Sequence, residues 1–142
     1  MRFVLCFLAA VLCSGTGLDA QNTAGVPVVN ADGPTVVAFF PNASKIGSDD
    51  ADGNEALSDF KHYASRVKKP FIQLGIRFTE EYGRSFRIRS GSESALFTRE
   101  TGTPGYYFFA HGKRPRIEYG VRTDSDLLAV ARQYFGLTDE KK

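Results

Sequence analysis

Residues 35–40 read Thr-Val-Val-Ala-Phe-Phe, and this stretch decides the fold. The run is apolar without a break, and Pro34 and Pro41 bound it. β-Branched and aromatic residues favour strands, and a strand that is apolar on both faces is typical of the centre of a covered sheet. We therefore expect a central strand here, covered on both sides.

A helix is expected over residues 54–68, after a polar loop at 41–53. Its apolar residues recur at three- and four-residue spacing, which gives one apolar stripe. They are Leu57, Phe60, Ala64 and Val67. Asp52 or Asn54 is expected to cap this helix, and Pro70 to stop it.

The rest of the chain alternates between strand and turn signals. Residues 71–78 predict a strand, and 86–89 and 95–98 predict a hairpin around Ser90-Gly91-Ser92. A short helical turn at 79–82 is an alternative for the irregular middle. A short edge strand at 26–29 is also expected.

The C-terminal part predicts a strand at 105–110, a tight turn at 111–113 and a returning edge strand at 116–119. A last helix is expected from Thr123 to Gly136. The order is a βαβ unit followed by a ββα unit. It predicts an α/β fold, a three-layer α/β/α sandwich with a mixed sheet and helices on both of its faces.

The N-terminus reads as an export signal. Arg2 supplies the positive charge, residues 3–13 are nearly all apolar, and a cleavage site is expected after Ala20. The apolar run is short for a permanent membrane span. The alternative is an uncleaved N-terminal anchor, whereas bulky Leu12 before Cys13 disfavours a lipoprotein. We expect a secreted or periplasmic protein that has no stable membrane insertion once the signal is cleaved.

The expected segments are a signal peptide at 1–20, a leader at 21–33, one domain at 34–136 and a tail at 137–142. Cleavage would remove Cys6 and Cys13, which are the only cysteines. It would leave 17 basic and 15 acidic residues, a net charge of +2 that is too small to favour nucleic acid as a partner.

The order of elements over residues 34–136 resembles the thioredoxin fold. Gly102-Thr103-Pro104 precedes a strand, as the family's cis-proline does, and the hairpin and last helix follow with similar spacing. The resemblance implies a cis bond before Pro104 and a short backbone edge there that pairs with an extended peptide. The alternative is that Pro104 only shapes the turn.

The resemblance breaks at the active loop. Thioredoxins place a Cys-x-x-Cys pair after the first central strand, where this chain has Ser44-Lys45-Ile46-Gly47. A second alignment, which resembles peroxiredoxins, puts Ser48 at the position of the reactive cysteine. The nucleophile of both families is a thiolate, and a serine hydroxyl hardly ionises near neutral pH. The sequence therefore excludes a thiol oxidoreductase.

The resulting expectation is an exported thioredoxin-like domain without redox activity or cofactor, which binds a protein or peptide or serves as an accessory module. The alternative is a degenerate thioredoxin- or peroxiredoxin-type enzyme with a recast, non-thiol active loop that uses Ser44, Ser48 or a bound ion. The expected binding surface consists of two segments. They are Ser44, Lys45, Ile46, Gly47 and Ser48, and Thr103, Pro104 and Gly105.

Charge is distributed unevenly along the chain. The acidic residues of 48–59 match a calcium loop in part, but Ser48 stands where Asp is needed and Asp59 where Glu is needed. We expect a helix cap there and no metal site. Basic residues gather in the C-terminal half, with Arg87 and Arg89 on one strand face. They would either steer an acidic partner or form a solvated face that also protects a sheet edge.

Overall fold

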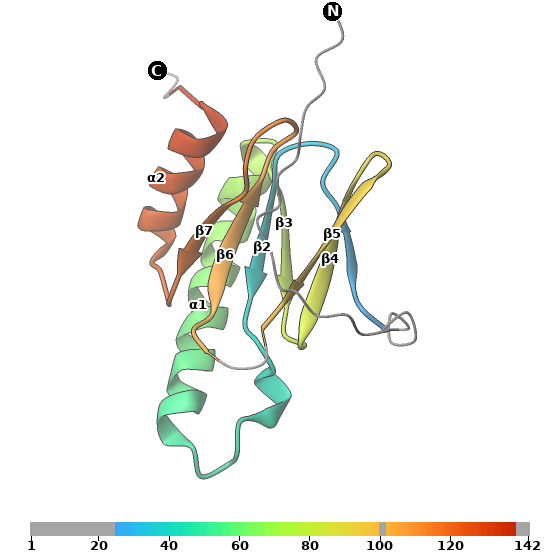
Figure 1. Cartoon of the computed structure of the whole chain (residues 1–142). Coiled ribbons are helices and arrows are strands. Elements are labelled where there is room, and N and C mark those ends of the chain that lie inside the picture. The colour runs from blue at the N-terminus through green and yellow to red at the C-terminus, as the bar shows by residue number, and fades with distance from the viewer. Residues whose placement is uncertain (1–24, 100–101, 139–142) are drawn as a thin grey trace, which may run out of the picture.

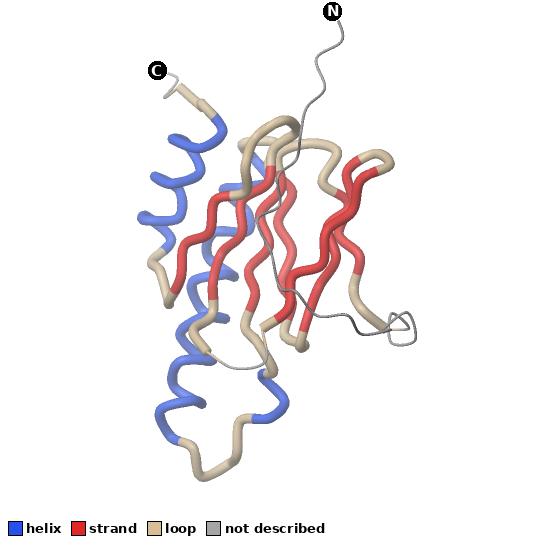
Figure 2. Tube along the Cα trace, viewed as in Figure 1, coloured by secondary structure: helices blue, strands red, loops and turns tan. Residues whose placement is uncertain are grey.

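The computed structural model describes residues 25–99 and 102–138. Seven strands, two α-helices and one short 3₁₀ helix follow one another in these residues (Figure 1, Figure 2). Their bounds are β1 Val28–Asn30, β2 Thr35–Phe39, η1 Ala43–Lys45, α1 Ala51–Gln73, β3 Arg77–Glu81, β4 Ser85–Ser90, β5 Glu93–Thr98, β6 Gly105–Phe109, β7 Arg116–Tyr119 and α2 Asp124–Phe135.

The strands form two mixed sheets. The larger sheet has the order β3-β2-β6-β7, in which β2 runs parallel to β3 and antiparallel to β6. The smaller sheet has the order β1-β4-β5, in which β1 is parallel and β5 antiparallel to β4. The central position expected for residues 35–40 is confirmed, since β2 has a partner on each side and every one of its residues is buried.

The two faces of the larger sheet are covered differently. One face packs against α1 and α2 through a core that includes Val36, Phe60 and Phe108. The other packs against the smaller sheet through Phe39 and Phe86, whose ring centroids lie 5.1 Å apart. Among the described residues both helices therefore lie on one face (Figure 1). The prediction of helices on both faces is wrong, because a hairpin and β1 bury their inward side chains where the second helical layer was expected.

The first helix is longer than its sequence indicates, because it passes through Pro70 and ends at Gln73. The Leu74 N–H donates to the Pro70 carbonyl at 3.1 Å, as in a continuing helix. Phe71 is completely buried and packs against Phe78, with ring centroids 5.6 Å apart. Burial of this side chain offsets the helix-breaking effect of proline. The predicted strand at 71–78 is therefore wrong in its first part, and β3 begins only at Arg77.

Local signals predicted the hairpin and the last helix well. β4 and β5 pair from Ser90 opposite Glu93, and Gly91 in the two-residue loop has a φ of 57°. Thr123 caps α2 by accepting from the Asp126 N–H at 3.3 Å. β7 is the edge that was predicted. No helix within the described ranges is long and apolar enough to cross a membrane.

Candidate functional site

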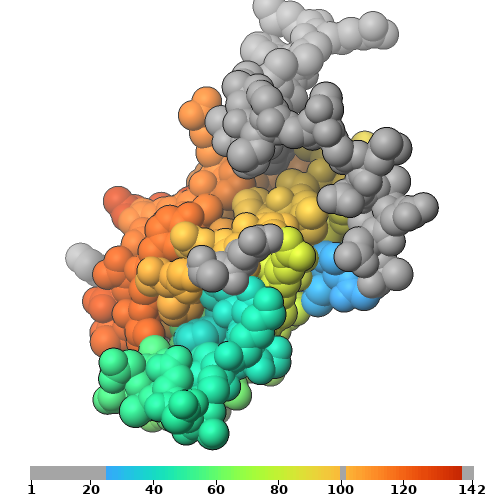
Figure 3. Space-filling view, turned by 60° about the horizontal axis from the view of Figure 1, so that its bottom comes forward, coloured from blue at the N-terminus to red at the C-terminus, as the bar shows by residue number. Residues whose placement is uncertain are grey.

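The expected binding loop lies where β2 ends, at a protruding end of the molecule (Figure 3). Ser44, Lys45, Gly47 and Ser48 are exposed, whereas Ile46 is half-buried against the helix-side core. The Gly47 carbonyl accepts from the Asp50 N–H at 3.1 Å and from the Asn54 side chain at 2.9 Å. The loop is thus held to the start of α1.

One of the acidic residues after this loop caps the helix that follows. Asp50, and neither Asp52 nor Asn54, caps α1 by accepting from the Gly53 N–H at 2.9 Å. Asp52 and Asp59 lie within the helix itself. No group of three or more side chains suited to a metal occurs in the part of the chain that the structure describes.

Thr103-Pro104-Gly105 lies at the same end of the sheet, since Gly105 pairs with Phe39. The bond before Pro104 is trans, because no cis peptide occurs among the described residues, and the expected cis bond is wrong. The Pro104 carbonyl already accepts from the Gly120 N–H at 2.7 Å, and the Thr103 carbonyl from Arg99 at 3.2 Å. Both carbonyl groups are therefore already hydrogen-bonded within the domain.

Gly105, the last residue of this segment, is closely packed against β7 and a neighbouring ring of β6. A Cβ atom there would meet the Glu118 carbonyl oxygen and the Tyr107 and Tyr119 rings, each at 3.3 Å. Glycine at this position therefore serves the close approach of β6 and β7.

A recast active loop that uses Ser44 or Ser48 would need a base beside the serine, and neither His62 nor His111 lies close to one. His62 lies eleven residues into α1, which places it about 16 Å along the helix from its start. Its ring contacts Tyr63, with centroids 5.2 Å apart. His111 follows the end of β6, whereas Ser44 and Ser48 follow the end of the antiparallel β2, so they lie at opposite ends of the sheet. The structure does not bring these groups together.

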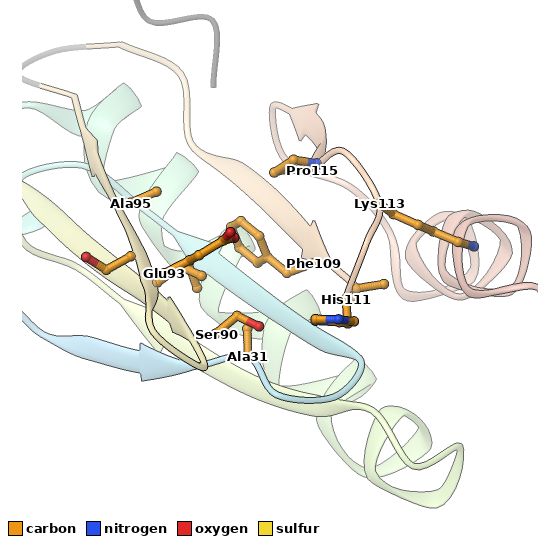
Figure 4. Close-up of a pocket in the computed structure, with 11 residues that line it drawn as sticks. Ala31, Ser90, Glu93, Ala95, Phe109, His111, Lys113 and Pro115 are labelled. Atoms are coloured by element: carbon orange, nitrogen blue, oxygen red, sulfur yellow. The ribbon is translucent and has the colours of Figure 1, made fainter. Parts of the chain in front are cut away.

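A cavity of about 280 Å³ lies at the other end of the molecule, between the start of β5 and the end of β6 (Figure 4). Its lining is mostly apolar, with the Phe109 ring between the two sheets. The lining residues are Ala31, Ile88, Ser90, Glu93, Ser94, Ala95, Phe109, Ala110, His111, Lys113 and Pro115. The Lys113 ammonium points away from the cavity and donates to the Tyr134 carbonyl at 2.7 Å.

β5 borders this cavity, and one of its edges pairs with no strand of the described residues. The Arg87 N–H donates to Pro27, and the Arg89 carbonyl accepts from Ala31, so the backbone groups of these two residues face β1. Their partners on β5 are Leu96 and Ser94. In an antiparallel pair such partners do not exchange hydrogen bonds, and their own N–H and C=O groups point outward. Leu96 and Ser94 therefore present backbone donors and acceptors to the free side of β5.

The other strand edges of the described residues are better protected than β5. β1 has only three residues, three of the five residues of β3 are charged, and two of the four residues of β7 are charged. β5 has six residues with one charge, Glu93, at its first position. Its Leu96 side chain is 48% exposed. Proteins usually shorten or charge an exposed edge to prevent pairing, and β5 lacks both protections.

The tyrosines of the helix-side core hold their protons tightly. Burial raises the pKa of Tyr106 to about 12. Burial and a hydrogen bond that Tyr82 donates to Glu80 at 2.5 Å raise the pKa of Tyr82 as well. The Tyr106 hydroxyl has no hydrogen-bond partner among the described residues. These phenols are structural groups and not nucleophiles at neutral pH.

Sequence reasoning missed the cavity and the β5 edge. The uncharged run Ser94-Ala95-Leu96-Phe97-Thr98 was a usable signal, since an expected hairpin strand without charges is a poorly protected edge. Arg87 and Arg89 do not protect an edge, because they lie on β4 in the middle of the smaller sheet. The cavity residues come from three separate parts of the chain, which are Ala31, residues 88–95 and residues 109–115, and only their packing brings them together.

The comparisons with known proteins give no family for this chain. No protein-family model matches the sequence, and no curated protein matches it.

Proposed function

We propose that this chain is an exported thioredoxin-like domain without thiol chemistry, and that it binds an extended segment of another protein along the free edge of β5. Export is inferred from the signal-like residues 1–20, and the lack of thiol chemistry from the absence of cysteine after residue 13. The strand order β3-β2-β6-β7 supports a thioredoxin-like unit, with α1 between the parallel pair and α2 after the final hairpin. In this proposal the smaller sheet takes the place of a second helical layer.

The observation that carries the binding proposal is the edge of β5, which has no partner strand within residues 25–99 and 102–138, beside a mostly apolar cavity. Strand addition needs a row of free backbone groups for affinity and a pocket beside that row for specificity. Ser94 and Leu96 supply the first, and the cavity that Ala95 helps to line supplies the second. The surface expected at residues 103–105 has less support than β5, because the carbonyl groups of Thr103 and Pro104 are already bonded within the domain.

Selection from a library of random peptides, followed by amide hydrogen exchange, tests the proposal. We expect the bound peptide to protect the amides of Ser94 and Leu96, which point away from β4 and have no partner on a described strand. Leu96→Pro should abolish binding, because proline removes an outward N–H that β4 does not use. Leu96→Ala is the matched control, since it keeps the N–H and truncates the same side chain.

Both variants should keep the far-UV circular dichroism of the parent protein. Protection at residues 44–48 instead of β5, or full binding by a folded Leu96→Pro variant, would contradict the proposal.

The enzyme alternative has less support. Ser44 and Ser48 lie at the opposite end of the sheet from His111, and His62 contacts Tyr63 on α1. A serine nucleophile needs an adjacent base to be activated, and neither histidine supplies one here.

A further inference from the structure

We propose that the segment bound by β5 is acidic: it carries carboxylates on both sides of one apolar residue, so that Arg87 and Arg89 contact the carboxylates and the cavity takes the apolar side chain. This inference rests on the proposed function, and it names the chemistry of the partner.

The pleat of β5 fixes which way an added strand would point its side chains. Side chains directly opposite one another on paired strands lie on the same face of a sheet. Phe97 faces the larger sheet, so Ala95 does too, whereas Ser94 and Leu96 face outward. A peptide residue opposite Ala95 would therefore point inward to the cavity. Its two neighbours would lie opposite Ser94 and Leu96, on the outer face.

The outer face of the smaller sheet is positively charged. Alternation along the three strands places eight described residues on it, and none of them is acidic. They are Val28, Asn30, Ser85, Arg87, Arg89, Ser94, Leu96 and Thr98. Within the described ranges no carboxylate pairs with Arg87 or Arg89. This face therefore complements a negatively charged strand.

Arg87 already extends toward the free edge. Its Nη1 atom lies 3.4 Å from the hydroxyl oxygen of Ser94, which is the diagonal neighbour of Arg87 on β5. Adjacent strands are about 4.8 Å apart, so a strand beyond β5 would lie one such spacing from Ser94. A glutamate on that strand, opposite Ser94, would reach the guanidinium across a small side chain. A charge-assisted hydrogen bond of this kind is stronger than a neutral one.

The cavity limits the central residue of the peptide. Its volume of about 280 Å³ falls below that of pockets for drug-sized molecules, and it suits one large apolar side chain. Phe109 and Ala110 provide apolar contact. Glu93 and His111 also line the cavity, so its polar groups come from the hairpin and the turn after β6.

The test uses three synthetic peptides and the purified protein. The first peptide is acetyl-Thr-Val-Glu-Leu-Glu-Val-Thr-amide, the second has glutamine in place of both glutamates, and the third has glycine in place of leucine. Affinities are measured by isothermal titration calorimetry at low and at physiological salt. We expect the first peptide to have the highest affinity of the three. The glutamine peptide should bind about tenfold more weakly, and the affinity of the first peptide should fall as the salt concentration rises.

Variants of the protein test whether Arg87 causes the preference for the charged peptide. Arg87→Gln should lower the affinity for the glutamate peptide about fivefold and leave the affinity for the glutamine peptide nearly unchanged. A double-mutant cycle over the two proteins and the two peptides measures this coupling. Lys68→Gln removes an equivalent charge from the exposed side of α1 and should have no effect. A far-UV spectrum and an unfolding midpoint for each variant exclude a general loss of fold.

The outcomes separate the two proposals. Equal binding of the glutamate and glutamine peptides, both lost in Leu96→Pro, would overturn the acidic partner and keep the strand-binding function. No binding of any peptide at millimolar concentration would overturn both. A dimer in sedimentation that Leu96→Pro dissociates would show that a second copy of the chain occupies the edge, and it would also overturn the acidic partner.

Discussion

Pro70 gives a sharp test of the fold, because the sequence predicts that the helix stops there and the structure continues it to Gln73. We expect Pro70→Ala to stabilise the protein. Proline in a helix interior is about 3 kcal/mol less favourable than alanine. The alanine N–H would donate to the Arg66 carbonyl one turn earlier, where proline has no donor.

Two effects reduce this gain. Removing proline increases the freedom of the unfolded chain, which costs about 0.4–1 kcal/mol. The half-buried ring also loses apolar contact, at about 0.8 kcal/mol per buried methylene group. The net stabilisation is then about 1 kcal/mol. In urea, where small proteins have slopes of about 1–3 kcal/mol per molar, the unfolding midpoint should rise by about 0.5 M.

Urea unfolding followed by circular dichroism measures this shift. Lys69→Ala is the matched control, because it changes an exposed neighbour to the same residue and should alter stability by less than about 0.5 kcal/mol. A lower midpoint for Pro70→Ala than for the parent protein would refute the reasoning. It would mean that the helix ends before Pro70, as the local sequence suggests.

Three further predictions concern single side chains. Tyr106→Phe should raise the free energy of unfolding by about 1 kcal/mol in urea titrations, because it removes a buried hydroxyl without a partner. A lower free energy of unfolding for this variant would show that the hydroxyl is hydrogen-bonded. Burial raises the pKa of Glu81, so the folded state holds this proton more tightly than the unfolded chain, and the associated stability is lost as the pH rises through the folded pKa. Glu81→Gln should therefore melt at a higher temperature than the parent protein at pH 7 but not at pH 3. An equal increase in melting temperature at both pH values would show that the effect does not come from the raised pKa of Glu81. Asp50→Ala should lower the free energy of unfolding by about 1 kcal/mol through loss of the cap on α1, whereas Asp52→Ala should have a smaller effect.

The elements that the sequence predicts well are those with local determinants. Thr123 and Gly136 mark the two ends of α2, and Gly91 marks the loop of the hairpin. Each acts through its own backbone and near neighbours, so no knowledge of the rest of the fold is needed.

The parts that sequence reasoning misses depend on distant contacts. The helix continues past Pro70 because Phe71 is buried against Phe78, which no helix propensity includes. The covering of the second sheet face by a hairpin, instead of a helix, depends on the stacking of Phe86 and Phe97 over the larger sheet. The binding surface expected at Pro104 rested on resemblance, which does not include the hydrogen bond that the Pro104 carbonyl accepts from the Gly120 N–H.

β2 joins the two cores of this protein, since alternate residues such as Val36 and Val37 belong to opposite faces. Removing this strand would take apolar contacts from the helical layer and from the smaller sheet at the same time. The chain should accordingly unfold in one step, with the β2 amides the last to exchange with deuterium, and cutting it into two fragments should leave both unable to fold alone.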